Sequence, residues 1–232
     1  MRPFAACLVA MVLIFATSCA RPAQAAPESL PKPNTDLPAA KEGETRTAVL
    51  AGGCFWCVEA AFEQLKGVSD VTSGYAGGTK ETANYEQYAS GGHVEVVRIT
   101  YDPHVITYAQ LLQVLFTISE PTVKDKQGPD AGPQYRMAVF YANDDEKRVA
   151  EAYIKQLTDA NVFDKPIQTT LDPLKAFYPA EEYHQDYVKK NPNHPYVRAW
   201  SIPKIEKTRQ AFPELLQSSA AAAAAGSAPS AK

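Results

Sequence analysis

The chain has 232 residues and a formal net charge of −3, and 45% of its residues are hydrophobic. This length fits one domain with a substantial core. The slight acidity argues against a nucleic-acid-binding protein, which would carry a basic surface.

Residues 1–25 have the layout of a secretory signal, with a short basic start, one apolar run and then small residues. The apolar run is too short and too interrupted for a typical membrane-spanning helix. Two processing routes stay open, which are cleavage after Ala25 and lipid attachment at Cys19. Both predict an exported protein of the periplasm or cell envelope, and only lipidation would tie it to the membrane. Removing residues 1–25 takes away two arginines and no acid, so the net charge becomes −5.

The two flanks of the predicted domain have compositions that do not favour a core. Residues 26–45 contain four prolines and are expected to form an extended linker. Residues 214–232 end in SSAAAAAAGSAPSAK, which has too little apolar bulk to fold, and are expected to form a disordered tail. One folded domain is therefore expected over residues 46–213, and we expect it to be a monomer.

Hydrophobic periodicity predicts strands and helices in a mixed order. Strands are predicted over residues 46–51, 68–75, 93–101 and 135–141, with a weak strand over 166–171. Helices are predicted after Gly53, after a Thr107 cap, after an Asn143 cap, and briefly after Pro179. Long polar loops cover residues 76–92 and 120–134.

This order favours an α+β two-layer sandwich over a doubly wound parallel sheet. A ferredoxin-like core, built from split βαβ units and carrying long loops, is the most economical arrangement. In the strand over residues 93–101, alternation places Glu95 on the same face as Val97 and opposite Val94 and Val96.

The stretch GGCFWCVE places Cys54 at a predicted helix start and Cys57 one turn further on. Exposed amide groups and the helix dipole at that end favour a thiolate at Cys54. A second thiol within reach provides an attacking and a resolving sulfur, the pair that returns a sulfenic acid to a reducible disulfide.

Other interpretations of the cysteine pair remain open at this point. It can be half of a zinc site, although the sequence has no second C-x-x-C and no close pair of histidines. It can also be a thioredoxin-type redox motif or a structural disulfide, but so small a loop contributes little stability.

Phe55 and Trp56 sit out of phase with the apolar stripe of the predicted helix, which is formed by Val58, Ala61, Phe62 and Leu65. Aromatic rings beside a nucleophile can bind an apolar or sulfur-bearing group, because sulfur packs favourably against ring faces. Partial burial of the two rings explains their position equally well.

A series of motifs closely resembles the A-type peptide methionine sulfoxide reductases. In chain order they are GCFWCVE, GYAGG, YEQ, GHVEVV, YDP, QGPDAGPQYR and FYPAEEYHQDY, and they cover residues 52–187. The resemblance implies reduction of the S epimer of methionine sulfoxide, free or in proteins, without a metal or organic cofactor. It also implies an α+β fold with a ferredoxin-like core.

The resemblance further implies a role for each site residue. Cys54 would be the nucleophile and Glu95 the proton donor, with Glu95 kept neutral near pH 7 by burial or by a neighbour. The substrate's methyl group would contact Phe55 and Trp56. Its oxygen would be bound by three further residues, namely Tyr85, Asp130 and Tyr135.

Many relatives resolve the sulfenic acid with distant C-terminal cysteines, which this chain lacks, so Cys57 must do so alone. Thioredoxin, or a thioredoxin-like protein outside the cytosol, would then reduce the disulfide. A thiol–disulfide oxidoreductase acting on protein disulfides is the rival enzyme. A metal-binding or adhesion module of the envelope is the non-enzymatic alternative.

Overall fold

The computed structural model describes residues 30–218, so the predicted signal over 1–25, with Cys19, lies outside the described residues. The strands are β1 (Arg46–Gly52), β2 (Val68–Ala76), β3 (Val94–Tyr101), β4 (Lys126–Gln127), β5 (Asp130–Ala131), β6 (Met137–Tyr141), β7 (Thr170–Pro173) and β8 (Phe177–Pro179). The helices are α1 (Phe55–Phe62), α2 (Tyr108–Ile118), α3 (Asp144–Asp159), α4 (Tyr187–Lys190) and α5 (Ile202–Ala211). Within residues 30–218, no helix is long and apolar enough to span a membrane.

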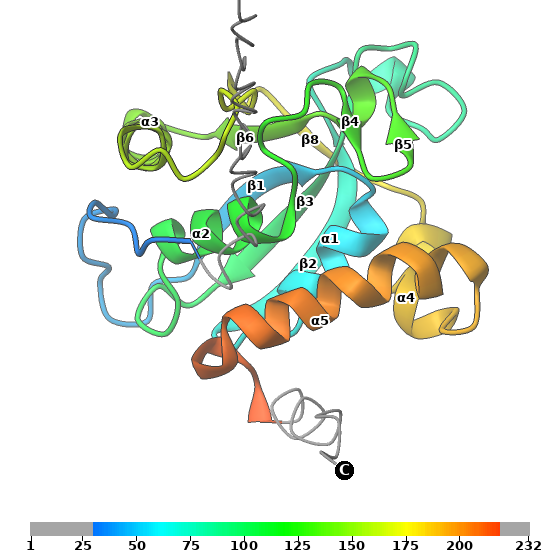
Figure 1. Ribbon diagram of the computed structural model, residues 1–232. Helices are drawn as coiled ribbons and strands as arrows, with labels where there is room; N and C mark the ends of the chain where they lie inside the picture. Colours follow the sequence, from blue (N-terminus) through cyan, green and yellow to red (C-terminus); the bar gives the residue numbers. More distant parts are fainter. Residues whose placement is uncertain (1–29, 219–232) are drawn as a thin grey trace, which may run out of the picture.

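A curled six-stranded sheet lies at the centre of this mixed α/β fold, in the order β7-β6-β1-β3-β2-β8 (Figure 1). Neighbouring strands run antiparallel except β6 and β7, which are parallel. Strand β3 therefore lies between β1 and β2, although α1 connects those two strands along the chain. This arrangement places β3 beside the turn between β1 and α1, which leads directly to Cys54.

The two faces of the sheet are covered differently. One face packs against α1, α2 and α3 and builds the main core around residues such as Leu50, Val97 and Leu115. The other face carries a smaller cluster, with Val94 and Val96, covered in part by the chain before β8. The predicted alternation in β3 is confirmed, so Glu95 points towards the face that carries the helices.

The ordered region is longer than the predicted 46–213. Residues 30–45 have no regular structure, yet they lie against α2 and α3 rather than forming a free linker. The carbonyl oxygen of Leu30 accepts a 2.6 Å hydrogen bond from Gln113, and that of Pro31 accepts one of 3.0 Å from Tyr153. At the other end, Leu216 is buried and forms a bridge with Leu65, so the fold continues past residue 213.

Most predicted elements are confirmed, and the differences lie towards the C-terminus. The weak strand forms as β7 at residues 170–173, four residues later than expected at its start. The segment after Pro179 is a 3₁₀ turn followed by the four-residue α4. Helix α5 was not predicted from the sequence; it follows a π-helical turn (Val197–Ser201) and lies beside α1 (Figure 1).

Gly53 forms the turn between β1 and α1, with a φ of +88°. A Cβ at this position would lie 2.5 Å from the Cβ of Gln127, a buried residue of the β4–β5 hairpin. The turn therefore needs glycine both for its backbone conformation and for the close approach of the hairpin.

We predict that Gly53→Ala lowers the free energy of unfolding by about 1–3 kcal/mol. Gly92→Ala is the matched control, because Gly92 also has a positive φ (+77°) but has open space where its Cβ would lie. Urea titration of both variants measures the difference. Equal losses would show that the approach of the hairpin does not matter.

Candidate active site

Cys54 is the N-cap residue of α1, as predicted, and its carbonyl oxygen accepts from the amides of Cys57 and Val58. The turn at Gly52 and Gly53 brings the chain from β1 directly to this position. Both cysteines are free thiols and buried, with Cys54 9% exposed and Cys57 3% exposed. The two sulfurs are hydrogen-bonded to one another, the arrangement that a disulfide-forming pair requires.

Glu95 lies on β3 beneath the first turn of α1 and is only 2% exposed. Its Oε2 accepts a 2.9 Å hydrogen bond from the backbone N–H of Phe55, and its Oε1 contacts the hydroxyl of Tyr88 at 2.7 Å. Burial raises the pKa of Glu95 to about 7, and the bonds from Phe55 and Tyr88 limit that rise. A neutral carboxylic acid is therefore available near pH 7.

The sequence predicted a thiolate at Cys54, but in the structure the surroundings of the two thiols favour the thiolate at Cys57. Burial raises the pKa of the Cys54 thiol well above its ordinary value, because removal from water disfavours the thiolate, and the neighbouring Cys57 and Glu95 add to the rise. The first helical amide also donates to Glu95 rather than to sulfur. The pKa of Cys57 is instead lowered to about 6, mainly by the hydrogen bond from Cys54 and also by the charge of Lys204. Hydrogen bonding and the nearby positive charge thus favour the thiolate at Cys57 over the thiolate at Cys54.

Aromatic rings surround the start of α1. Trp56 stacks on Tyr187 with 3.6 Å between ring centroids, and its Nε1 donates to Nδ1 of His184 at 3.1 Å. Phe55 is buried, with its ring centroid 5.1 Å from that of His184. The predicted pair of rings is therefore held in place by histidine and tyrosine neighbours from residues 184–187.

The predicted oxygen-binding residues reach the site in different ways. The hydroxyl of Tyr135 lies 3.3 Å from that of Tyr88, which itself contacts Glu95. Tyr85 is 43% exposed and stacks on Tyr88 with 5.7 Å between centroids. The carboxylate of Asp130 accepts a hydrogen bond from Tyr196. Tyr88, which the sequence analysis did not select, is thus the tyrosine in direct contact with the acid.

The C-terminal segment supplies three polar groups that the sequence analysis missed. The hydroxyl of Tyr196 lies beside both sulfurs, and Ser201 Oγ is 3.1 Å from Cys57 Sγ. Lys204 lies in the first turns of α5 and donates from Nζ to the carbonyl oxygen of Gly52 at 2.8 Å. No local motif marks these residues. Their proximity to the cysteines could not be predicted, because Ser201 lies 144 positions after Cys57 in the chain. Tyr196 and Lys204 line a cavity of about 220 Å³ with both thiols.

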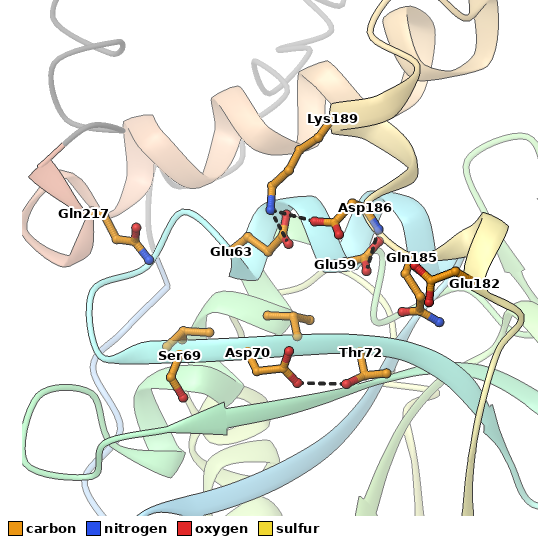
Figure 2. A pocket seen from close by; sticks show the side chains of 12 residues that line it. Glu59, Glu63, Ser69, Asp70, Thr72, Glu182, Gln185, Asp186, Lys189 and Gln217 are labelled. Atoms are coloured by element: carbon orange, nitrogen blue, oxygen red, sulfur yellow. Dashed lines mark hydrogen bonds and ion pairs between the residues drawn. The ribbon is translucent and has the colours of Figure 1, made fainter.

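A larger pocket of about 470 Å³ lies at the other end of α1 and contains neither sulfur (Figure 2). Lys189 pairs there with Glu63 at 2.7 Å and with Asp186 at 2.8 Å. Glu59 is buried behind them and accepts a 3.1 Å hydrogen bond from the amide of Asp186. Burial raises the pKa of Glu59 to about 8, so this carboxyl is mostly neutral at pH 7.

A buried thiol pair beside a neutral carboxylic acid and aromatic rings defines a thiol-based oxidoreductase, and the comparisons specify which kind. The family model for peptide methionine sulfoxide reductase matches residues 46–216. The reductase MsrA of Natronomonas pharaonis is 52% identical over 176 residues, covering 75% of this chain and 99% of that one. MsrA of Thermus thermophilus is 51% identical over 172 residues, covering 73% and 97%.

Solved structures agree with this assignment. Reduced Mxr1 from Saccharomyces cerevisiae superposes with a TM-score of 0.59 at 32% identity, covering 67% of this chain and 91% of that one. Methionine sulfoxide reductase A of Corynebacterium diphtheriae gives a TM-score of 0.56 at 30% identity, covering 72% and 88%. The chain belongs to the peptide methionine sulfoxide reductase family, in its A type, and is an oxidoreductase.

The buried carboxyl of Glu59 predicts a pH dependence of stability. Its pKa is raised in the folded state, so the folded protein binds more protons than the unfolded chain between about pH 4.5 and 8. Stability should therefore fall as pH rises through this window, by up to about 1.4 kcal/mol for each pKa unit.

We predict that Glu59→Gln flattens this part of the stability curve, whereas Glu182→Gln does not. Glu182 lines the same pocket, but its side chain is 91% exposed. Urea unfolding at several pH values between 5 and 9 makes the comparison. The same slope in Glu59→Gln as in the unchanged protein would show that Glu59 is ionised at neutral pH.

Proposed function

We propose that this enzyme reduces the S epimer of methionine sulfoxide, free or in proteins, through a sulfenic acid on Cys54 that Cys57 resolves as a disulfide. The observation that carries the proposal is the buried Glu95 carboxyl, which bonds to the first amide of the helix that Cys54 caps. Membership of the family supports the reaction, and the local geometry supports the roles of the residues.

The first step needs a nucleophile and an acid on the same sulfoxide. Cys54 passes its proton to the Cys57 sulfur, to which it is hydrogen-bonded, as it attacks the sulfoxide sulfur. Glu95 gives its proton to the sulfoxide oxygen, because an unprotonated oxygen leaves sulfur poorly. The oxygen transfers to Cys54 as S–OH, the sulfide departs, and the two electrons gained by the substrate sulfur come from Cys54.

The surroundings of the acid support the assignment of the other site residues. Tyr88 donates its hydroxyl proton to Glu95, and Tyr135 places a second hydroxyl 3.3 Å from that of Tyr88, where it can donate to the sulfoxide oxygen. Tyr85 stacks beside them, and Asp130 would orient the hydroxyl of Tyr196. On the other side of Cys54, the rings of Phe55 and Trp56 would hold the methyl group.

Selection between epimers follows from fixing three directions around one sulfur atom. The oxygen is directed to Glu95, the methyl group to the aromatic rings, and the nucleophile arrives from Cys54. The remaining substituent of the sulfoxide then points in opposite directions in the two epimers. We propose that only the S epimer directs its main chain outwards to solvent, which is also what a protein-bound substrate requires.

The second step closes the disulfide and leaves the enzyme oxidised. Cys57 lies one helical turn from Cys54, and its sulfur already contacts that of Cys54. We propose that thioredoxin, or a thioredoxin-like protein outside the cytosol, reduces this disulfide. The absence of further cysteines between residues 58 and 232 supports direct reduction of the Cys54–Cys57 bond.

Three further features belong to the same proposal. A ferredoxin-like core is supported by the order β6-β1-β3-β2, in which each of α1 and α2 connects two strands that flank a third.

Export to the periplasm or cell envelope is supported by the composition of residues 1–25, with a membrane attachment only if Cys19 is lipidated. We also propose a monomer, which light scattering of the purified protein tests.

Replacing each cysteine separates the two steps. With each epimer of methionine sulfoxide and dithiothreitol, Cys54→Ser should release no methionine. With the S epimer and no dithiothreitol, Cys57→Ser should release one equivalent of methionine and retain a sulfenic acid that a dimedone probe labels, and with dithiothreitol it should cycle slowly. Mass spectrometry and chromatography measure both products. Full activity of Cys54→Ser, or equal turnover of both epimers, would refute the proposal.

The pKa of Glu95 predicts how the first step depends on pH. Because the protonated acid is required and its pKa is about 7, the rate of methionine release should decline above pH 7. Glu95→Gln should lower the rate by about 10²–10⁴-fold and abolish this decline, since an amide cannot give up a proton in this range. Single-turnover kinetics measure both effects. An unchanged pH profile in Glu95→Gln would exclude Glu95 as the proton donor.

A further inference from the structure

Lys204 is a cation placed against the resolving thiol rather than against an acid. Within residues 30–218, the only hydrogen bond of its side chain is the 2.8 Å contact from Nζ to the carbonyl oxygen of Gly52. Gly52 directly precedes the turn that carries Cys54, so this bond fixes the ammonium group beside the thiol pair. An ammonium group has three donors, which leaves two for the cavity that both sulfurs line.

Cys57 is held by the same segment of the chain. Its sulfur lies 3.1 Å from the hydroxyl of Ser201, a fully buried residue of the π-helical turn that leads into α5. Ser201 and Lys204 are about one helical turn apart, so their side chains lie on the same face of their own helical segment, and this face is directed at α1. A hydroxyl donor and a positive charge thus converge on a thiol that is itself only 3% exposed.

We propose that Lys204 is a positioning residue that keeps Cys57 in its thiolate form for the resolving step. This inference rests on the function proposed above and adds a residue to it.

The need for this charge arises after the first step. In the resting enzyme the largest influence that lowers the pKa of Cys57 is the hydrogen bond from Cys54. Once Cys54 is a sulfenic acid, its S–H no longer exists, and Cys57 has taken up the proton. Lys204 remains in place, and its charged form favours renewed loss of that proton.

The resolving step balances without any further reactant. The Cys57 thiolate attacks the Cys54 sulfur, the S–S bond forms and the S–O bond breaks. Hydroxide leaves and becomes water by taking up the proton that Cys57 released. Cys57 is oxidised and Cys54 is reduced. A resolving thiol with a pKa near the working pH is the most effective one, because it combines thiolate with high intrinsic nucleophilicity.

Several other ionisable groups surround this thiol. Tyr196 and Cys54 hydrogen-bond to it, and Glu95 interacts with it through charge across the first turn of α1. Glu120 and Asp130 act on Lys204 from the loop that includes the β4–β5 hairpin and favour its charged form, while burial lowers the pKa of Lys204. Because both carboxylates would raise the pKa of Cys57, the lysine is the group whose charge favours the thiolate.

The test measures the ionisation of Cys57 in the full chain with Cys54→Ser, so that one thiol of the pair titrates. Alkylation of Cys57 by iodoacetamide, followed by mass spectrometry of its peptide, gives the apparent pKa from the pH dependence of the rate. Lys204→Gln removes the charge but keeps a donor for Gly52. It should raise the apparent pKa by about one unit, which corresponds to about tenfold less thiolate below the pKa.

Two variants control for a structural effect. Lys204→Arg keeps the positive charge and should return the pKa of Cys57 to within about 0.3 units of the parent. Lys66→Gln makes the same change of net charge beyond the C-terminal end of α1, where the side chain is exposed and does not line the cavity, and should shift the pKa by less than about 0.3 units. An unchanged pKa in Lys204→Gln, or an equal shift in Lys66→Gln, would overturn the inference.

Kinetics in the presence of Cys54 provide a second readout. After one equivalent of methionine sulfoxide, closure of the disulfide in Lys204→Gln should be about tenfold slower at pH 7 and should recover near pH 9, where Cys57 ionises unaided. Normal closure at pH 7 would also contradict the role of Lys204. If neither the parent nor the variant releases methionine, the proposed function fails, whereas the thiol titration still decides the role of the lysine.

Discussion

The site depends on the contact between the Glu95 carboxyl and the first turn of α1. The amide of Phe55 is one of the unpaired donors at a helix start, and Glu95 satisfies it from the neighbouring strand. The same bond fixes the acid close to the residue that caps the helix, which is Cys54. Burial raises the pKa of this carboxyl to about 7, so a substantial fraction is neutral at that pH, and the bonds from Phe55 and Tyr88 prevent its pKa from rising further. The contact with Phe55 therefore sets the position of the acid, and burial at that position sets its protonation.

The two cysteines are best understood as one unit that shares a proton. A helix N-terminus alone would favour a thiolate at Cys54, but at this site the terminal amide is already bonded to Glu95 and the sulfur is removed from water. The negative charge is favoured instead at Cys57, where Ser201 and Lys204 of the C-terminal segment meet α1. Attack by Cys54 thus begins with transfer of its proton over a short distance, and no outside base is needed. The C-terminal segment completes a site whose other half lies 144 to 152 residues earlier in the chain.

Local patterns were sufficient to predict the part of the site that lies on regular elements. The double glycine at the end of β1 predicted the sharp turn to Cys54, and alternation in β3 predicted the face of Glu95. The pKa of Cys54 could not be predicted, because burial depends on packing against distant segments. The position of α5 and of Lys204 was missed for a related reason, since α5 buries only Ile205 and Thr208 and has no clear apolar stripe. Residues 30–45 look like a linker by composition, yet their carbonyl oxygens accept hydrogen bonds from α2 and α3.

The central claim is that Glu95 is a neutral acid beside the thiol pair at the pH where the enzyme works. Infrared difference spectroscopy tests it most directly, with ¹³C-labelled glutamate in the reduced protein and with Glu95→Gln as the reference. The account predicts a protonated-carboxyl C=O band, absent from the reference, that disappears with a midpoint near pH 7. A band that is lost near pH 4.5, the ordinary value for glutamate, would contradict the account.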